Sequence, residues 1–375
     1  MQPIERREFL KTVMIAGVTV NGAQGVTADP QPVKKDSGKW RGVNLGGWLA
    51  LEKWITPSVY TGLRAPDEYS LCEELGKAKA AAHLKKHRES WITADDFKWM
   101  AAHGLNAVRL PVNYGVAEEN PPFITAMDSV DWAFRTANAH GIGVLLDLHG
   151  VPGSQNGFDH SGRQGKLGWH TTKNNIDHSL RIIADLAARV KGYDNLIGFE
   201  LLNEPRWDVP LDVLKRFYMD AYHRVRDQIG KDKAAVVMHD GFRQLEWGDF
   251  MRESDYANVI LDTHPYQCFT DDDRKRNLHQ QIVVALLDRK RQLDAMQRQF
   301  PSIVGEWSCG LPPESLEGRT GFALDVAMRA YADAQLINFD ATRGWFFWTY
   351  KTHEGGAWSF RDCVQRGWMP DKYGL

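Results

Sequence analysis

Several familiar motifs are missing from this sequence. Its four cysteines never form a Cys-x-x-Cys pair, and its 13 histidines include no His-Glu-x-x-His; these are the spacings typical of zinc sites. A Gly-x-Gly-x-x-Gly turn, which marks dinucleotide-binding folds, is also absent. We therefore expect neither a metal nor another cofactor.

The chain also lacks an excess of charge of either sign. The 46 Lys and Arg are scattered and nearly balance the 48 Asp and Glu, which leaves a formal net charge of −2. Because nucleic-acid binding needs a basic patch or stripe, we expect no nucleic-acid partner. We expect a neutral partner and a monomeric protein. What the chain does have is aromatic residues, with 14 Trp, 11 Tyr and 16 Phe, and such large rings pack in a core or form a binding platform.

The first 28 residues are typical of an export signal. Arg6 and Arg7 precede a short apolar run, and small residues end the stretch. The apolar run is too short to span a bilayer as a stable helix. We expect a twin-arginine-type signal peptide over 1–28, and a mature domain over 29–375 that is periplasmic or extracellular and free of the membrane. The alternative is a disordered cytoplasmic tail. Export would permit disulfides, but no cysteine spacing enforces a pairing, so we expect buried free thiols.

Short, nearly continuous apolar runs alternate with helical stretches along the mature chain. Such runs suit parallel strands that are buried on both faces, and eight β-α units close most naturally into a single (β/α)8 TIM barrel. A doubly wound open sheet is the alternative. The predicted strands are 42–47, 106–112, 144–149, 197–203, 235–240, 259–264, 303–306 and 344–350, and the predicted helices include 94–103, 128–140, 179–190, 211–229 and 324–338.

Active sites of such barrels lie at the carboxyl ends of the strands. Glu204 and Glu306 stand out there, because they follow the fourth and seventh strands on roughly opposite sides of the barrel mouth. Cleaving an acetal needs one protonated carboxyl for the leaving oxygen and one ionised carboxyl that faces the anomeric carbon. The pair therefore indicates a glycosidase. The other polar or aromatic residues at these strand ends are Arg109, His149, Asn203, His239, Asp240, His264, Tyr266 and Trp348.

Eight segments in order along the chain carry a family resemblance. They read RGVNLGGW (41–48), WITPS (54–58), GLNAVRLP (104–111), LDLHGVPGSQNGFD (146–159), GFELLNEP (198–205), HPYQCF (264–269), GEWS (305–308) and FWTYK (347–351). In these segments the chain resembles the family 5 glycoside hydrolases, and within them the fungal-type exo-1,3-β-glucanases. The resemblance covers almost the whole mature chain.

This resemblance implies roles for individual residues. Glu204 matches the acid/base and Glu306 the nucleophile of an anomer-retaining enzyme, whose carboxyls lie about 5–5.5 Å apart. Arg109 matches an arginine beside the nucleophile, where a cation keeps the carboxyl ionised.

Further matches surround the substrate. His149, Asn203, His264 and Tyr266 match residues around the sugar whose bond breaks. Trp348 matches the aromatic floor beneath that sugar. Phe158 and Phe269 match a pair that grips the leaving sugar, Glu52 matches an acid that binds the terminal glucose, and Asp159 belongs to the same substrate-binding set.

The chain departs from the fungal pattern at three places. His160 stands where an asparagine that contacts the terminal sugar is usual, and Pro265 replaces a histidine. The stretch 307–345 is shorter than in the fungal enzymes, and a more open cleft would permit internal cleavage.

The function we expect is hydrolysis of β-1,3-glucan or related β-glucosides by double displacement, from the chain end and with release of glucose. One alternative is a β-glucosidase or transglycosylase for other β-glucosides, such as glycolipids, aryl glycosides or diglycosides, and another is an endo-acting glucanase. The non-enzyme alternative is a catalytically silent carbohydrate-binding barrel. Such a binding protein would not need both glutamates together with Arg109.

Overall fold

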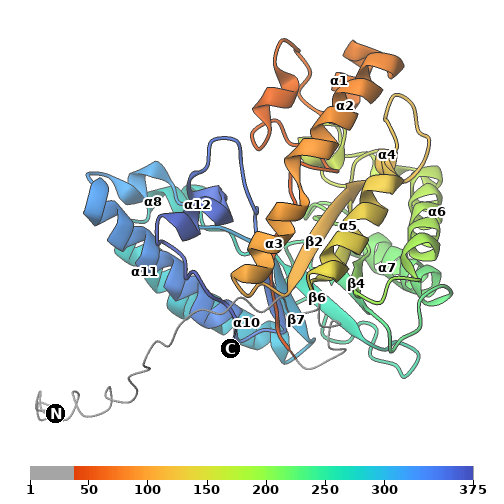
Figure 1. Ribbon diagram of the computed structural model, residues 1–375. Helices are drawn as coiled ribbons and strands as arrows, with labels where there is room; N and C mark the ends of the chain where they lie inside the picture. Colours follow the sequence, from red (N-terminus) through yellow and green to blue (C-terminus); the bar gives the residue numbers. More distant parts are fainter. Residues whose placement is uncertain (1–37, 375) are drawn as a thin grey trace, which may run out of the picture. The chain divides into compact units, whose positions relative to one another are not determined.

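Eight parallel strands, each paired with its neighbours along the chain, close into a barrel because β1 also pairs with β8. The computed structural model describes residues 38–374 (Figure 1). The predicted (β/α)8 TIM barrel is confirmed, and the open-sheet alternative is wrong. The signal peptide predicted over 1–28 lies outside the described residues. The strands are β1 (Trp40–Asn44), β2 (Ala107–Asn113), β3 (Gly143–Gly150), β4 (Leu196–Glu200), β5 (Ala235–His239), β6 (Val259–Thr263), β7 (Ser302–Trp307) and β8 (Gly344–Phe347).

Helices cover the outside of the barrel (Figure 1). The large hydrophobic core lies between the strands and these helices. None of the helices in the described residues is long and apolar enough to cross a membrane. The helices are α1 (Glu68–Leu75), α2 (Lys77–Trp91), α3 (Ala94–Ala102), α4 (Tyr114–Ala117), α5 (Met127–Ala139), α6 (Lys173–Val190), α7 (Leu211–Arg226), α8 (Asp271–Lys275), α9 (Leu278–Val283), α10 (Arg289–Gln297), α11 (Gly321–Phe339) and α12 (Phe360–Gln365), with a π-helical turn, η5 (Val284–Asp288), between α9 and α10.

All eight strands form where they are predicted, but β1, β4 and β8 each end three residues earlier than expected. β4 ends at Glu200, so Asn203 and Glu204 lie in the loop that follows it. β8 ends at Phe347, so Trp348 also follows its strand. The cysteines are unpaired as predicted; Cys72, Cys309 and Cys363 are buried, and Cys268 is only partly buried.

Helices α1 and α2 were not predicted. They lie between β1 and α3 and pack around a small apolar cluster of their own, which includes Leu71 and Leu84. The N-terminus of α1 is capped by the side chain of Asp67, which accepts a hydrogen bond from the Ser70 amide. Helix α2 is mostly polar, so its sequence carries little of the apolar periodicity by which a helix is recognised.

The inside of the barrel changes from apolar to charged toward the carboxyl ends of the strands. Because every second strand residue faces inward, Arg109, Asp147 and Asp262 each follow an apolar interior residue by two positions. Glu200 occupies the equivalent level on β4 and pairs with Arg109. The apolar layer beneath consists of Ala107, Leu145, Ala235, Val237, Ile260, Ile303 and Phe346.

The position of Glu306 depends on an irregularity in β7. Ile303 belongs to the apolar interior layer, and Glu306 lies three residues later, so a regular strand would turn its side chain outward. The pairing of β7 with β8 shifts register between Val304 and Trp307. This bulge turns Glu306 back toward Arg109, with which it pairs.

Gly305 is needed at this bulge. A Cβ built on it would lie 1.8 Å from Asp262 Oδ2, and its amide already donates a hydrogen bond to Asp262 Oδ1 at 2.5 Å. We expect Gly305→Ala to lower the free energy of unfolding by about 2 kcal/mol or more, because an added methyl in a filled interior forces its neighbours apart. Chemical denaturation measures this. Gly192→Ala is the control, since a Cβ there meets nothing within 4 Å; equal stability of the two variants would contradict the crowding.

Candidate active site

Arg109 occupies the centre of the barrel, fully buried, and reaches three carboxylates. Its Nε donates to Glu200 Oε2 at 2.7 Å, its Nη2 lies 3.1 Å from Asp147 Oδ2, and its Nη1 donates to Glu306 Oε1 at 3.0 Å. The remaining donors reach the side-chain oxygens of Asn44 at 2.9 Å and Asn203 at 2.7 Å. One guanidinium thus ties together residues from β1, β2, β3, β4 and its following loop, and β7.

Glu306 is held by both of its carboxylate oxygens. Oε1 accepts from Arg109, and Oε2 accepts from the Tyr266 hydroxyl at 2.9 Å. His264 Nδ1 lies 3.5 Å from the same Oε2. The carboxyl group is therefore fixed in one orientation.

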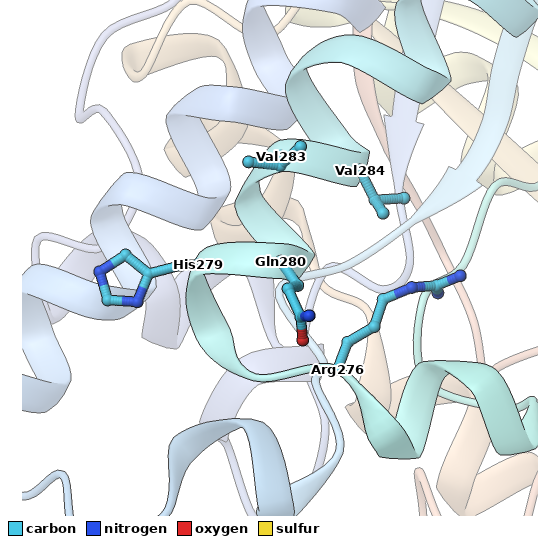
Figure 2. Close-up of a pocket in the computed structure, with 5 residues that line it drawn as sticks. All are labelled: Arg276, His279, Gln280, Val283 and Val284. Carbon is cyan, nitrogen blue, oxygen red and sulfur yellow. The ribbon is translucent and has the colours of Figure 1, made fainter.

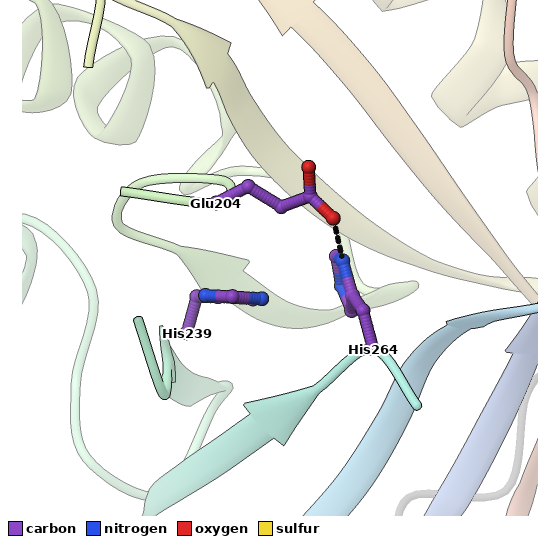
Figure 3. Close-up of side chains that lie close together, drawn as sticks. All are labelled: Glu204, His239 and His264. Atoms are coloured by element: carbon purple, nitrogen blue, oxygen red, sulfur yellow. Dashed lines mark hydrogen bonds and ion pairs between the residues drawn. The ribbon is translucent and has the colours of Figure 1, made fainter. Parts of the chain in front are cut away.

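Glu204 lies four residues after the end of β4, in an uncommon backbone conformation. Its φ is 41°, in the left-handed region that residues with a Cβ seldom adopt. Such strain persists where the surroundings enforce it and often marks a functional residue. Its Oε1 lies 2.7 Å from His264 Nδ1, and its Oε2 lies 3.5 Å from His160 Nε2. Figure 3 shows Glu204 and His264 joined by this hydrogen bond, with His239 beside them.

His264 contacts both glutamates and influences the pKa of each. Burial raises the pKa of Glu306 to about 8, although the charges of His264 and Arg109 oppose the rise. Burial also works to raise the pKa of Glu204, but the hydrogen bond and charge of His264 overcome it and bring the value to about 2. With His264 protonated, the proton of the pair rests on Glu306. The acid/base role predicted for Glu204 instead requires this proton on Glu204. His264 contacts both carboxyls, so it lies between the two positions of the proton.

An aromatic wall borders the pair. The indole of Trp348 stacks on the His149 imidazole, with ring centroids 5.5 Å apart and planes 5° from parallel. His149 Nδ1 lies 2.7 Å from Asp147 Oδ2, and its Nε2 lies 3.4 Å from the Asn203 amide. These contacts join the residues predicted to surround a sugar into one connected site.

Glu52 and Asp159 lie at the edge of the same space. Burial raises the pKa of Glu52 well above its usual range, and the nearby charges of Asp159, Glu306 and Glu204 add to the rise. Trp54 Nε1 donates to Glu52 Oε2 at 2.8 Å, whereas the buried Oε1 has no partner among the described residues. Glu52 can therefore accept another hydrogen bond.

The two phenylalanines predicted to grip a leaving sugar lie on different loops. The Phe158 ring is 5.5 Å from the ring of His160, and the Phe269 ring is 5.4 Å from Tyr266 and 6.1 Å from Trp358. Within residues 38–374, no recorded ring contact joins the two phenylalanines. Phe269 is 63% exposed and free to meet a ligand.

Several site residues were not singled out from the sequence. Asp147, Glu200 and Asp262 interrupt otherwise apolar strands, and Asp147 and Asp262 stand two positions before His149 and His264. A charged residue inside an apolar strand, on the same strand face as the polar residue that ends the strand, is the signal that could have revealed them. Trp54 and Trp358, whose rings meet edge to face with centroids 5.6 Å apart, carry no such signal.

Among residues 38–374, two groups of side chains have ligand atoms close enough to hold a metal ion. They are Glu204, His239 and His264 (Figure 3), and Glu200, Asp262 and His264, each within 4.8 Å. His264 Nδ1 is already bonded to Glu204, and the Arg109 cation lies against Glu200. Several ligand atoms of both groups are thus already used in hydrogen bonds and ion pairs. The expectation that the protein binds no metal stays a prediction.

A separate hollow lies along α9, between the end of α8 and the start of η5. It is lined by Arg276, His279, Gln280, Val283 and Val284 (Figure 2). None of the residues predicted to be catalytic or to bind substrate borders it, so the candidate active site is the mouth of the barrel.

Known proteins resemble this chain in sequence and in fold. The family model described as cellulase (glycosyl hydrolase family 5) matches residues 74–353. The glucan 1,3-beta-glucosidase of Blumeria graminis is 38% identical, in an alignment that covers 88% of this chain and 87% of that protein. The probable glucan 1,3-beta-glucosidase A of Emericella nidulans is 36% identical, covering 88% and 90%. The crystal structure of rutinosidase from Aspergillus niger has a TM-score of 0.76 and 20% identity, covering 88% of this chain and 97% of that one, and this likeness shows the fold alone.

Removing a charged partner of Arg109 should lower the free energy of unfolding. We expect Glu200→Ala to lower the free energy of unfolding by about 3–5 kcal/mol, because it leaves part of a buried cation uncompensated. Chemical denaturation gives the value. Asp294→Ala is the control, since it breaks the exposed Lys290–Asp294 pair of α10 and should cost no more than about 1 kcal/mol. Similar losses in the two variants would contradict the role assigned to the buried cluster.

Proposed function

Because the chain belongs to glycosyl hydrolase family 5, we propose that it is a retaining β-glucosidase that removes glucose from the ends of β-1,3-glucan chains. The relatives named as glucan 1,3-beta-glucosidases support this substrate. The fold, the two glutamates and Arg109 support glycoside hydrolysis. An intact pair of buried carboxyls also argues against a catalytically silent binding protein.

The observation that carries the proposal is the spacing of the two carboxyls. His264 Nδ1 lies 2.7 Å from Glu204 Oε1 and 3.5 Å from Glu306 Oε2. These two oxygens can be no farther apart than the sum of these distances, so the two carboxyls lie close together. The arrangement supports a retaining mechanism, whose carboxyls lie about 5–5.5 Å apart.

In the first step, Glu306 attacks the anomeric carbon while Glu204 gives its proton to the leaving oxygen, so that a bond to the enzyme forms as the glycosidic bond breaks. Arg109 and Tyr266 hold the Glu306 oxygens in position. The proton that Glu204 needs comes from His264 Nδ1, which can recover one from Glu306 and leave that carboxyl ionised for attack.

In the second step, Glu204 acts as a base. As a carboxylate it takes a proton from water, the water oxygen bonds to the anomeric carbon, and Glu306 leaves as a carboxylate. Two substitutions at the same carbon restore the β configuration. A sugar hydroxyl in place of water would give transglycosylation, which stays open as a prediction.

Residues at one side of the site favour action at the chain end. Glu52 places beside the pair a buried oxygen that has no partner in the described part of the chain, and the nearby charge of Asp159 helps to raise the pKa of Glu52. A terminal glucose offers the hydroxyls that such acceptors bind. Trp348 provides a flat apolar surface against the same sugar.

The cellular setting is part of the proposal. We propose export to the periplasm or beyond through the twin-arginine-type signal of residues 1–28, which rests on the sequence alone. We also propose that the protein is a monomer and, on the basis of the balanced charge, that it has no nucleic-acid partner.

The substrate is tested by following products over time from laminarin, cellobiose, an aryl β-glucoside and a β-mannan. We expect glucose to be the only early product from laminarin, because the pocket accepts a chain end. Early mixed oligosaccharides would contradict exo action. Turnover of the aryl glucoside alone would contradict a β-1,3-glucan substrate.

The division of roles is tested by Glu204→Ala. We expect kcat/KM on laminari-oligosaccharides to fall by about 10²–10⁴, with a smaller loss on an aryl glucoside whose leaving group needs no proton. Azide should partly restore turnover on that aryl glucoside and yield a β-glucosyl azide, since the anion attacks without a base.

Glu306→Gln is the matched variant. It removes the nucleophile and should be inactive on every substrate, with or without azide. Equal losses of Glu204→Ala on all leaving groups without azide rescue, or substantial activity of Glu306→Gln, would show that the roles are assigned wrongly.

A further inference from the structure

The imidazole of His160 faces the acid/base glutamate from the loop after β3. It lies in the short 3₁₀ turn η3 (Asp159–Ser161), at one of the three places where the chain departs from the fungal pattern. Its side chain is only 13% exposed, and its Nε2 lies 3.5 Å from Glu204 Oε2. Neither step of the mechanism described above uses this imidazole.

The turn that carries His160 is anchored to the end of β3. The hydroxyls of Ser161 and Ser154 share a hydrogen bond at 2.7 Å, and the Ser161 amide donates to the Phe158 carbonyl at 3.2 Å. Ser161 also packs on Gly150, where an added Cβ would lie 2.4 Å from the Ser161 carbonyl oxygen. The side chain of His160 therefore projects from a fixed backbone.

Two neighbouring rings fix the imidazole itself. Its centroid lies 5.0 Å from that of His149 and 5.5 Å from that of Phe158, and its plane is tilted against both. His149 is in turn stacked on Trp348. His160 is thus packed against the aromatic wall of the site, with its Nε2 beside Glu204.

His160 is neutral at pH 7, and its one ring proton belongs on Nε2. Burial and the charge of His149 lower the pKa of His160 to about 4. The charges of Glu204 and Asp159 oppose this fall, and that of His264 adds to it. A neutral imidazole has one N–H donor and one acceptor nitrogen. Nδ1 has no hydrogen-bond partner among the described residues, so no acceptor draws the proton there, whereas Nε2 faces a carboxylate.

Each carboxylate oxygen of Glu204 has one imidazole beside it. His264 Nδ1 lies 2.7 Å from Oε1, and His160 Nε2 approaches Oε2. The 3.5 Å separation is longer than an ordinary N–H···O hydrogen bond, but catalytic contacts commonly shorten when the reacting complex forms. Because a charged acceptor strengthens such a bond, the contact is strongest when Glu204 is the carboxylate base of the second step.

We propose that His160 is a positioning residue for this second step: its Nε2–H donates to Glu204 Oε2 and holds the carboxylate in the orientation that takes a proton from water. This role rests on the retaining mechanism proposed above. A carboxylate has about four lone-pair sites, so Glu204 can accept from both imidazoles and still take that proton. A misplacement of about 1 Å can cost up to about a hundredfold in rate.

The test uses a dinitrophenyl β-glucoside, whose leaving group needs no proton. Its kcat/KM therefore reports a first step that proceeds without help from Glu204, and a burst of dinitrophenolate shows that the second step limits kcat. In His160→Leu we expect kcat to fall about three- to tenfold, with a parallel fall in KM and a change in kcat/KM of less than about twofold. Loss of orientation at the base slows the second step alone.

Three further variants control this test. His160→Gln keeps an N–H donor at the end of its side chain and should recover most of kcat. His160→Met fills the space without a donor and takes the place of the leucine variant if that variant does not fold. His178→Leu breaks another histidine–glutamate pair, that of His178 with Glu118 outside the site, and should change neither kcat nor KM.

The possible failures are distinguishable. If Glu204→Ala leaves kcat on the dinitrophenyl glucoside unchanged, the retaining mechanism fails and the role of His160 fails with it. If Glu204→Ala slows the second step but the His160 variants match the wild type, the mechanism stands and His160 positions nothing. Equal falls in kcat and kcat/KM that glutamine does not repair would make His160 merely structural. A rise in kcat would mean that the imidazole only weakens Glu204 as a base, and it would also overturn the proposal.

Discussion

A single buried guanidinium organises the centre of this molecule. Burying an isolated cation is strongly unfavourable unless it is paired and hydrogen-bonded, so Arg109 requires the oxygens that surround it. Those oxygens come from Asp147, Glu200 and Glu306 and from two asparagines on separate parts of the barrel. The requirement to satisfy one charge thus positions the ends of several strands. It also fixes the orientation of the nucleophile, because Glu306 is one of the partners.

The same cluster sets the proton balance of the site. Three carboxyls face one guanidinium, and His264 is the other cation within reach. Burial raises the pKa of Asp147 to about 7 and that of Glu200 to about 8, although the charge of Arg109 opposes both rises. His264 contacts both catalytic carboxyls and Asp262. A site built in this way can move a proton from one carboxyl to the other without importing charge into the barrel.

The sequence predicted the barrel because its strands are apolar on both faces and recur eight times. It predicted the two glutamates because polar residues close those strands and because eight segments match a known family. It did not predict how Glu306 turns inward, since the bulge in β7 is a property of the pairing with β8. The contact of His160 with Glu204 joins residues from different loops. Neither the hydrophobic period of a strand nor the residue spacing along it predicts contacts between different loops, so only the folded structure reveals them.

The most direct test of the two-carboxyl account is the anomer of the first glucose released from laminarin, read by NMR before mutarotation. Two displacements at one carbon keep the configuration, so the account predicts β-glucose as the initial product. Initial α-glucose would mean that water attacks directly, and it would contradict the assignment of Glu306 as a nucleophile.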